Sequence, residues 1–510
     1  MFVPLTVSDF IDRAESVYAE RVGVVDEPAQ PAVSLGALTY RQMAELARRQ
    51  AAKLDELGVG VGDRVAIVSH NSARLLTSFF GVVGSGRVLV PVNFRLRPDE
   101  VAYIVEHSGA RVLIIDPELD EALAKVSAEF RVVLGNDEDL YAAEDVDPVP
   151  WTPDESATAT INYTSGTTAR PKGVQITHRN LWVNAVTFAM HVAVTDRDVY
   201  LHTLPMFHAN GWGMPFAMTG LGVKQVVIRT IDGAEILRRV AEHGVTVMCA
   251  APAVVAAVLD AAQGWEGEIP GRGRVRIIVA GAPPPTKTVV RVEQELGWEF
   301  IQIYGLTETS PLLTVNRSRA EWDGLSPEDR AANLIRAGQP ALGVTLATSE
   351  SGEVLARSNV ILEGYWRQPE ESARALADDW FHTGDGGVVG DDGYLTISDR
   401  KKDVIITGGE NVSSIEVEDV LFSHPAVSEV AVIGIPDEKW GETIKALVVL
   451  TPGAEASEGE LIAWCKEHAA GFKSPTSVEF REELARTATG KLQKFKLRAP
   501  YWEGHDRQVN

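Results

Sequence analysis

A loop of small and hydroxylated residues, set between two expected strands, decides how this chain is organised. It reads Ile161-Asn162-Tyr163-Thr164-Ser165-Gly166-Thr167-Thr168-Ala169-Arg170-Pro171-Lys172-Gly173-Val174. Gly166 and Gly173 let the backbone turn sharply and approach a ligand closely, and successive backbone N–H groups in such a turn suit anions. Lys172 adds a point positive charge that suits phosphate. The stretch is not a Walker A loop, because Gly173 and Val174 follow the lysine. It predicts a loop that holds a polyphosphate, with an ordinary surface turn as the alternative.

Length and composition exclude several classes of protein. At 510 residues the chain is too long for one core, so at least two domains are expected. The net charge of −23 argues against a nucleic-acid-binding surface, which needs clustered Lys and Arg. The sequence contains no run of roughly 18 apolar residues, so no membrane span is expected. Residues 1–4 show neither the basic region nor the apolar region of a signal peptide, so none is expected.

The two cysteines indicate the compartment. Cys249 and Cys465 lie far apart in sequence, so they give neither a disulfide framework nor a metal-ligand spacing. Cys249 sits in an apolar run and is expected to be a buried small hydrophobe. This usage fits a reducing compartment, and we predict a cytoplasmic protein. The sequence leaves the oligomeric state open, a homodimer included.

The pattern of apolar runs predicts the fold class. Apolar strands such as 88–92, 111–115 and 275–280 alternate with amphipathic helices, which is typical of parallel α/β sheets. After about residue 345, short strands are joined by Gly/Asp turns. The predicted class is therefore α/β: a large N-terminal domain of parallel α/β sheets plus a β-rich subdomain, and a small α+β C-terminal domain. The charged run at 398–403 is the expected boundary.

Two stretches in the first domain carry polar residues between apolar segments. The stretch 204–212 places His208 among aromatics, which suits a pocket wall, although a lone histidine is more often packed in a core. In the stretch 303–310, Tyr304 can stack on a flat ring, and Glu308 among threonines can hold Mg²⁺ together with its phosphates. A capping arrangement at a helix start is the alternative for Glu308.

Two later stretches each present one charged side chain. Asp385 is expected in a tight glycine turn, where its carboxylate could accept from two neighbouring hydroxyls, as on a ribose. An ordinary Asp-Gly turn is the default there. Lys491 lies on a glycine turn near the C-terminus, where a lysine is normally solvated.

In sequence order, these stretches resemble the adenylate-forming superfamily, which contains acyl- and aryl-CoA synthetases, peptide-synthetase adenylation domains and luciferases. The matching stretches are 163–173, 204–208, 304–309, 364–366, 383–385, 399–403, 408–411 and 489–491. The stretches 408–411 and 208–212 look most like acyl-CoA synthetases of the medium-chain and aryl type.

The resemblance implies two half-reactions. A carboxylate attacks the α-phosphate of ATP to give an acyl-adenylate and pyrophosphate, and the thiol of coenzyme A then displaces AMP. Such chemistry needs positioning and charge stabilisation rather than a protein nucleophile. Expected cofactors are ATP, Mg²⁺ and coenzyme A. Two alternatives remain: a stand-alone acyl-AMP ligase that loads the pantetheine of a separate acyl carrier protein, and an inactive nucleotide-binding homologue.

The resemblance also implies a role for each matched residue. The ATP phosphates are expected at Thr164, Ser165, Gly166, Thr167, Thr168 and Lys172, with Mg²⁺ at Thr164 and Glu308. Adenine and ribose are expected at Gly281, Ala282, Pro283, Tyr304, Gly305, Thr309, Asp385 and Arg400. The acyl pocket is expected at Phe207, His208, Trp212, Met214, Ala250, Ala280, Leu306 and Ser310. This set is mostly apolar, so a medium-chain fatty or aromatic acid is expected rather than an amino acid.

The mobile parts follow from the same resemblance. Residues 1–398 would form the adenylation domain, 399–402 a hinge with its pivot at Lys402, and 403–510 a lid domain that carries the catalytic Lys491. His208 and Glu308 are the other candidate catalytic residues. Coenzyme A is expected at Gly408 and Gly409, with Trp440 and Lys473 as weaker candidates.

Three positions depart from the superfamily's pattern. Ala169 stands where a glycine is usual, Gly386-Gly387 follows Asp385 where an apolar residue is usual, and the segment 343–352 is short for a β-hairpin region. The two glycines are expected to loosen the ribose site. None of the three removes a charged functional residue, so we expect an active enzyme.

Overall fold

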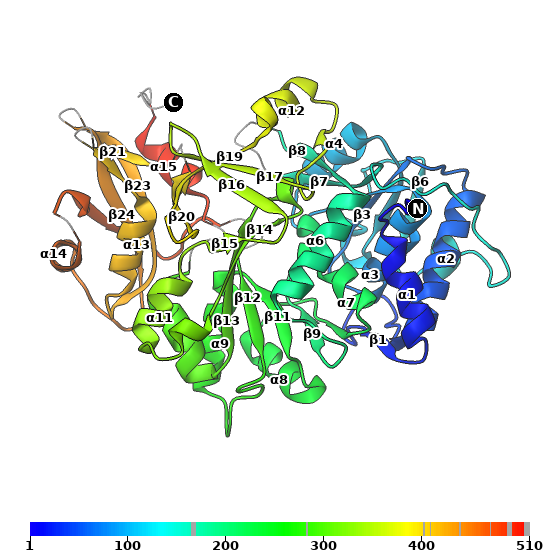
Figure 1. Ribbon diagram of the computed structural model, residues 1–510, viewed down its shortest axis with the longest axis horizontal. Coiled ribbons are helices and arrows are strands. Elements are labelled where there is room, and N and C mark those ends of the chain that lie inside the picture. Colours follow the sequence, from blue (N-terminus) through cyan, green and yellow to red (C-terminus); the bar gives the residue numbers. More distant parts are fainter. Residues whose placement is uncertain are drawn as a thin grey trace.

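The computed structural model describes residues 1–164, 170–281, 284–400, 403–407, 410–437, 440–469, 471–486 and 492–503. Within these residues a large N-terminal body carries two mixed sheets and a β-rich subdomain, and a smaller C-terminal body lies against it at the left of Figure 1. The fold class predicted from the sequence, mixed α/β with parallel sheets and a separate C-terminal domain, is confirmed.

The first sheet contains the strands on either side of the polyphosphate stretch, residues 161–174. Its strand order is β18-β8-β7-β4-β3-β5-β6. The bounds are β3 Arg64–Val68, β4 Val88–Val92, β5 Ala110–Ile115, β6 Phe130–Val133, β7 Thr158–Thr164, β8 Lys172–Thr177 and β18 Gly364–Tyr365. Strands β4, β3, β5 and β6 run parallel, as does β7 beside β4. All of β4 is buried, which fits an apolar run covered by helices on both faces of a sheet.

The second sheet is parallel at its centre and antiparallel at both edges. Its order is β15-β14-β13-β12-β11-β9-β10-β1-β2. The bounds are β1 Val22–Val25, β2 Ala37–Thr39, β9 Val199–His202, β10 Lys224–Val227, β11 Val247–Ala250, β12 Arg276–Val279, β13 Glu299–Gly305, β14 Leu312–Arg317 and β15 Gln339–Pro340.

Helices cover the faces of these sheets. They are α1 Ser8–Tyr18, α2 Tyr40–Glu56, α3 Ala73–Gly81, α4 Pro98–Ser108, α5 Asp137–Leu140, α6 His178–His191, α7 Met214–Gly220, α8 Gly233–His243, α9 Pro252–Gln263, α10 Thr286–Arg291, α11 Pro327–Leu334 and α12 Pro369–Ala375. No helix among the described residues has both the length and the apolar character needed to cross a membrane.

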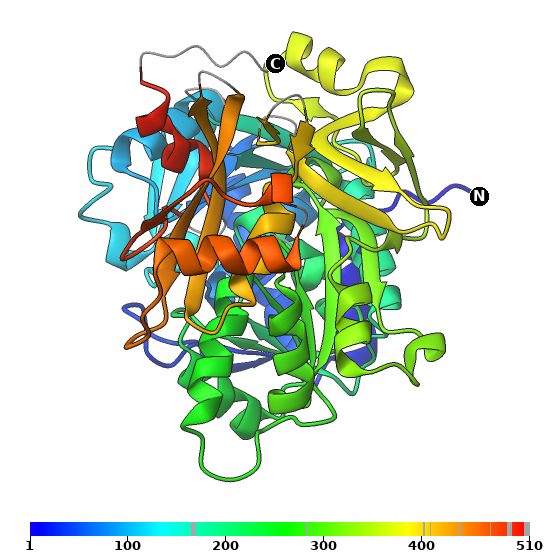
Figure 2. The ribbon, with the colours of Figure 1, turned by 90° about the vertical axis from the view of Figure 1, so that its left-hand side faces the viewer.

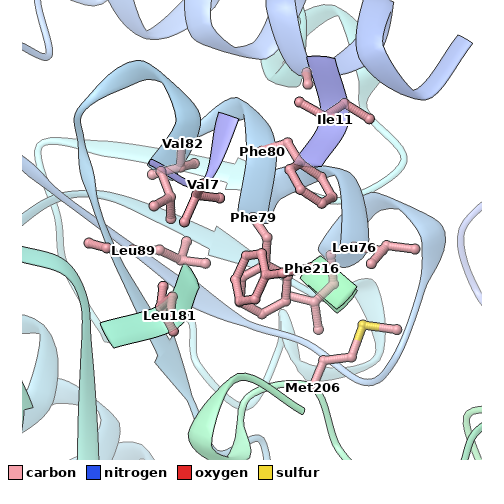
Figure 3. Packing of buried hydrophobic residues seen from close by; sticks show 14 of the residues in the cluster. Val7, Ile11, Leu76, Phe79, Phe80, Val82, Leu89, Leu181, Met206 and Phe216 are labelled. Atoms are coloured by element: carbon pink, nitrogen blue, oxygen red, sulfur yellow. The ribbon is translucent and has the colours of Figure 1, made fainter. Parts of the chain in front are cut away.

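An aromatic cluster joins the two sheets into one body. Phe216 of α7 meets the edges of Phe79 and Phe80 of α3, with ring centroids 5.5 and 6.0 Å apart. Phe10 of α1 packs against the same ring at 6.1 Å. Figure 3 shows the rings of Phe79, Phe80 and Phe216 in one cluster with Leu89 of the first sheet. Because burial of large apolar side chains is the main stabilising term in folding, this cluster holds the sheets at a fixed distance.

A third, antiparallel sheet forms the β-rich subdomain. Its order is β16-β17-β19-β20, with bounds Val344–Thr348, Glu353–Ser358, Phe381–Val389 and Leu395–Arg400. The short segment 343–352 thus forms a hairpin between β16 and β17. The prediction of a tight turn at Asp385 is wrong, because β19 continues through the glycines on both sides of it.

The C-terminal body packs helices on one small sheet. Its strands are β21 Ile405–Thr407, β22 Glu410–Val412, β23 Val427–Asp437, β24 Gly441–Leu450 and β25 Ser477–Phe480. Its helices are α13 Ser414–Phe422, α14 Glu458–His468 and α15 Lys494–Arg498. Figure 2 looks onto this body, and Figure 1 shows α13 on the side of it nearer the larger body. There, Asp419 accepts hydrogen bonds from the backbone N–H and the hydroxyl of Thr286 at the start of α10, both at 3.0 Å. The predicted boundary at 399–402 begins within β20, which ends at Arg400, and Lys401 and Lys402 lie outside the described residues.

Candidate active site

The polyphosphate stretch closes a β-hairpin. Strands β7 and β8 pair antiparallel, with Thr164 opposite Lys172 and Tyr163 opposite Gly173. A Cβ on Gly173 would lie 2.9 Å from Ile161 and 3.1 Å from Tyr163, so the glycine permits the close approach of the two strands. The hairpin therefore fixes both ends of the loop. The predicted residues Ser165, Gly166, Thr167 and Thr168, and the departure at Ala169, lie outside the described residues.

Tyr365 brings two predicted site residues to one ring. It lies on β18, which pairs with β8 so that Tyr365 stands opposite Val174. The Lys172 ammonium lies 5.1 Å from the centre of the Tyr365 ring, and the Tyr365 hydroxyl donates to Glu308 Oε1 at 3.0 Å. The superfamily pattern includes this tyrosine, but the sequence alone gave it no role.

Lys172 also has a partner that sequence reasoning missed. Its Nζ lies 2.5 Å from Glu371 Oε2, on α12. Nothing in the sequence marks Glu371, because acidic residues in the first turn of a helix are common.

Backbone packing shapes the turn that carries Glu308. A Cβ on Gly305 would lie 1.6 Å from the Pro311 carbonyl oxygen, so no other residue fits there without displacing the backbone. Thr309 is fully buried; its hydroxyl accepts from Leu306 N–H at 2.9 Å and donates to the Pro311 carbonyl at 2.5 Å. These bonds hold the Thr309 hydroxyl within its own turn, and its expected contact with the nucleotide stays a prediction. Ser310 is buried as well and donates to the Val360 carbonyl at 2.9 Å.

Two residues expected around adenosine are in contact. The Tyr304 hydroxyl donates to Asp385 Oδ2 at 2.8 Å, and Asp385 is only 8% exposed. Asp385 stands opposite Arg400 across β19 and β20. Gly281 follows β12 with a φ of +100°, which favours glycine. Ala282 and Pro283 lie outside the described residues.

Gly387, the second glycine after Asp385, has a packing reason. A Cβ on Gly387 would lie 2.7 Å from the Thr396 carbonyl oxygen and 2.9 Å from Val354. The glycine at 387 thus permits close packing of β19 against its neighbours. The pairing of β19 with β20 shifts register between Gly386 and Gly387, and the expectation that this pair loosens the ribose site stays a prediction.

The expected acyl wall contains a turn of left-handed backbone. Ala209, Asn210, Gly211, Trp212 and Gly213 all have positive φ, from 36° to 81°. Such a conformation is costly for residues other than glycine and persists only where surrounding contacts fix it.

Buried amides supply those contacts. Asn162 of β7 donates to the Asn210 side chain at 3.1 Å and to the Phe207 carbonyl at 3.2 Å. Asn210 in turn donates to the Thr160 hydroxyl at 2.9 Å. The strand that enters the polyphosphate loop therefore also holds the expected acyl wall.

Most of the expected acyl residues are buried in packed cores. Phe207, Trp212, Met214, Ala250 and Ala280 are buried, and His208 and Leu306 are half-buried. Two surface hollows, of about 410 and 200 Å³, lie elsewhere, and none of the expected acyl or nucleotide residues that the structure describes lines either one.

The residues expected at coenzyme A are only partly described. Trp440 is 49% exposed at the start of β24. Lys473 forms an ion pair with Glu416 of α13, with Nζ 2.6 Å from Oε1. Lys402, Gly408, Gly409 and Lys491 lie outside the described residues, and of Arg400 only the strand pairing is described.

Two mixed sheets, an antiparallel subdomain and a separate small domain, arranged around a hairpin loop with a lysine, define an adenylate-forming enzyme. The chain belongs to the AMP-binding enzyme family. The family's model matches residues 16–366, and the model of the AMP-binding enzyme C-terminal domain matches residues 416–491.

Known relatives share the whole length of the chain. A 4-hydroxybutyrate–CoA ligase of Metallosphaera sedula is 37% identical over 97% of this chain and 94% of the relative. The trans-cinnamate:CoA ligase of Petunia hybrida is 34% identical over 98% and 94%. A crystal structure of an anthranilate CoA ligase in complex with anthranoyl-AMP superposes with a TM-score of 0.85, at 28% identity over 98% of each chain.

The reaction class follows from these relationships. The protein is an AMP-forming carboxylic acid–CoA ligase, which uses ATP to activate an acid as acyl-AMP and transfers the acyl group to coenzyme A. The alternative of an inactive nucleotide-binding homologue is disfavoured, because the relatives named above are CoA ligases.

Proposed function

We propose that the acid is a medium-chain fatty or an aromatic carboxylic acid. The observation that carries this is the character of the expected acyl wall: Phe207, Trp212, Met214, Ala250 and Ala280 are apolar and buried. No member of the expected set carries a carboxylate for an amine or a Lys or Arg for a second carboxylate. Ser310, its hydroxyl-bearing member, already donates to a backbone carbonyl. An apolar wall of this kind favours an apolar acyl group.

The triphosphate of ATP would lie at the β7–β8 hairpin, between Thr164 and Lys172. Among the described residues no group of three or more His, Cys, Asp or Glu side chains could hold a metal ion. Mg²⁺ would therefore come with the phosphates, as this hard cation usually does. Glu308 fits as its carboxylate ligand and Thr164 as its hydroxyl ligand, and the ion would neutralise charge on the triphosphate. Tyr365 holds the Glu308 carboxylate by a hydrogen bond.

The adenosine would lie between Gly281 and Tyr304, with the ribose hydroxyls at Asp385. The 2.8 Å bond from Tyr304 orients the Asp385 carboxylate, and a carboxylate of this kind can accept from the two ribose hydroxyls. Arg400 would assist from the neighbouring strand.

The C-terminal domain would supply Lys491 to the carboxylate and α-phosphate in the first half-reaction only. Rotation about Lys402 would then remove Lys491 and bring Gly408 and Gly409 to the thiol of coenzyme A, with Trp440 and Lys473 toward its nucleotide. His208 would border the acyl group.

The proposal also covers the acceptor of the acyl group, the cellular compartment and the oligomeric state. Coenzyme A is the acceptor of the reaction class, and a carrier-protein pantetheine would be a second acceptor of the same chemistry. Cys249 and Cys465 are free and buried, which favours the cytoplasm. A homodimer is compatible with activity but not required, since the expected site is built from one chain.

A panel of acids tests the proposal. Carboxylate-dependent ATP–pyrophosphate exchange should be fastest with acids of about six to ten carbons or with benzoate-type and cinnamate-type acids, because the apolar wall stabilises them most. Amino acids and dicarboxylic acids should give little exchange. A strong preference for acetate, an amino acid or a dicarboxylic acid would contradict the proposed acid class. The preferred acid is then assayed side by side with free coenzyme A and with phosphopantetheinylated carrier proteins. The acceptor that is acylated faster is the one that the enzyme uses.

A further inference from the structure

The ion pair between Lys172 and Glu371 lies at the mouth of the polyphosphate hairpin. The two groups are 2.5 Å apart, and both side chains are partly exposed, at 20% and 34%. Lys172 is the first residue of β8 and directly follows the loop. The carboxylate therefore occupies a position beside the ammonium that a phosphate oxygen would otherwise take.

Glu371 is fixed there by its own segment. Helix α12 follows β18, and β18 pairs with β8. The Ser372 hydroxyl accepts from Tyr365 N–H at 2.8 Å and donates to the Gln368 carbonyl at 2.8 Å. These bonds tie the start of α12 to the strand beside Lys172. The ion pair is thus set by paired backbone rather than by two unrestrained side chains.

Neighbouring side chains stabilise the ionised form of Glu371. Its pKa lies below the ordinary value, chiefly because Lys172 donates a hydrogen bond to it, and Arg374 contributes a second one. An ionised carboxylate beside Lys172 attracts the ammonium and repels an incoming phosphate. Any polyphosphate that contacts Lys172 has to displace or share this partner.

We propose that Glu371 is a positioning residue that holds Lys172 between turnovers and competes with pyrophosphate for the Lys172 ammonium, which favours release of pyrophosphate. The inference rests on the proposed placement of the triphosphate at Lys172. Because ion pairs that are partly exposed contribute little, the competition is worth about two- to fivefold in affinity.

The test compares Glu371→Gln with Glu370→Gln. Both variants remove one charge from the same helix, but Glu370 is exposed and is not the carboxylate that faces Lys172. The inhibition constant for inorganic pyrophosphate and the KM for ATP are measured during acyl-CoA formation, at low and high salt. In Glu371→Gln both constants should fall about two- to fivefold, and the difference should shrink at high salt, since salt screens exposed charges. Glu370→Gln should match the wild type.

The variant Lys172→Met distinguishes a failure of the proposal for Glu371 from a failure of the proposed triphosphate site. The Lys172→Met change should weaken pyrophosphate and ATP binding, and adding Glu371→Gln to it should have no further effect, because the competition acts through the lysine. Unchanged or weaker pyrophosphate binding in Glu371→Gln overturns the inference while the role of Lys172 stands. The inference is also overturned if Glu371→Gln strengthens pyrophosphate binding equally in the wild type and in the Lys172→Met variant. If Lys172→Met binds both ligands normally, the proposed triphosphate site itself fails.

Discussion

At the scale of single residues, the bond from Tyr304 to Asp385 connects the two groups that we assign to adenine and ribose. Tyr304→Phe keeps the aromatic face and removes the donor to a nearly buried carboxylate. Hydrogen bonds to charged groups contribute about 1.5–3 kcal/mol, so we expect the KM for ATP to rise about tenfold or more. The KM for the acid should change little. Steady-state kinetics with each substrate varied will check this; equal rises in both KM values would contradict the assignment.

Residues such as Lys172, Glu308 and Asp385 could be predicted because each is a charged side chain in a stretch that resembles the superfamily. Glu371 could not, since its role depends on the pairing of β18 with β8, and β18 is only Gly364–Tyr365. The packing role of Gly387 could not be predicted either. It depends on a carbonyl oxygen of the neighbouring strand, which no local pattern reveals.

At the scale of elements, apolar runs predicted the buried strands well, because the central strands of both large sheets are covered on both faces. The prediction is wrong at β19, where the glycines on both sides of Asp385 indicate a turn and the strand continues through them. Glycine weakens a strand and marks close approach of another backbone as often as a turn. In β19 a φ of +73° accounts for Gly384, and the close approach of the Thr396 carbonyl oxygen on β20 accounts for Gly387.

Two buried histidines on neighbouring elements predict how stability depends on pH. His178 begins α6 and accepts from Val7 N–H at 3.3 Å, and His202 of β9 lies 2.9 Å from Gln225 Oε1. Burial lowers the pKa of each to about 4. Unfolding lets each bind a proton near its ordinary pKa of 6.5. The contribution of the two neutral histidines to the free energy of unfolding is therefore fully present above pH 6.5, and it is lost as the pH falls toward 4.

The expected loss is about 2 kcal/mol for each histidine between pH 7 and pH 5. His178→Gln should reduce this loss, because it removes one of the two groups. Thermal unfolding midpoints of the wild type and the variant at both pH values will measure the difference. The same fall in both proteins would show that His178 does not contribute.

At the scale of the whole molecule, Asp419 links the two bodies by capping α10 from the other domain. A contact present in one orientation of the C-terminal domain stabilises that orientation relative to others. Asp419→Ala should therefore change the two half-reactions in opposite directions, if the domain rotates between them as we propose. ATP–pyrophosphate exchange reports the first, and thiolation of a supplied acyl-adenylate reports the second.

Thr286→Ser is the matched control for this contact, because serine keeps both the backbone N–H and the hydroxyl donor. It should behave as the wild type. If Asp419→Ala leaves both half-reactions unchanged, or slows both equally, the contact does not select between orientations.

The left-handed turn at residues 209–213 belongs to the acyl wall that we propose, and there it would limit how the acid preference of this ligase can be redesigned. Its shape is fixed by the handedness of the backbone and by the amides of Asn162 and Asn210, which lie on different segments. β-Branched residues such as valine or isoleucine at Ala209 or Trp212 would be strained there whatever space the pocket offers. Libraries aimed at new acids should therefore vary neighbours with ordinary backbone, such as Phe207 and Met214, and keep the turn intact.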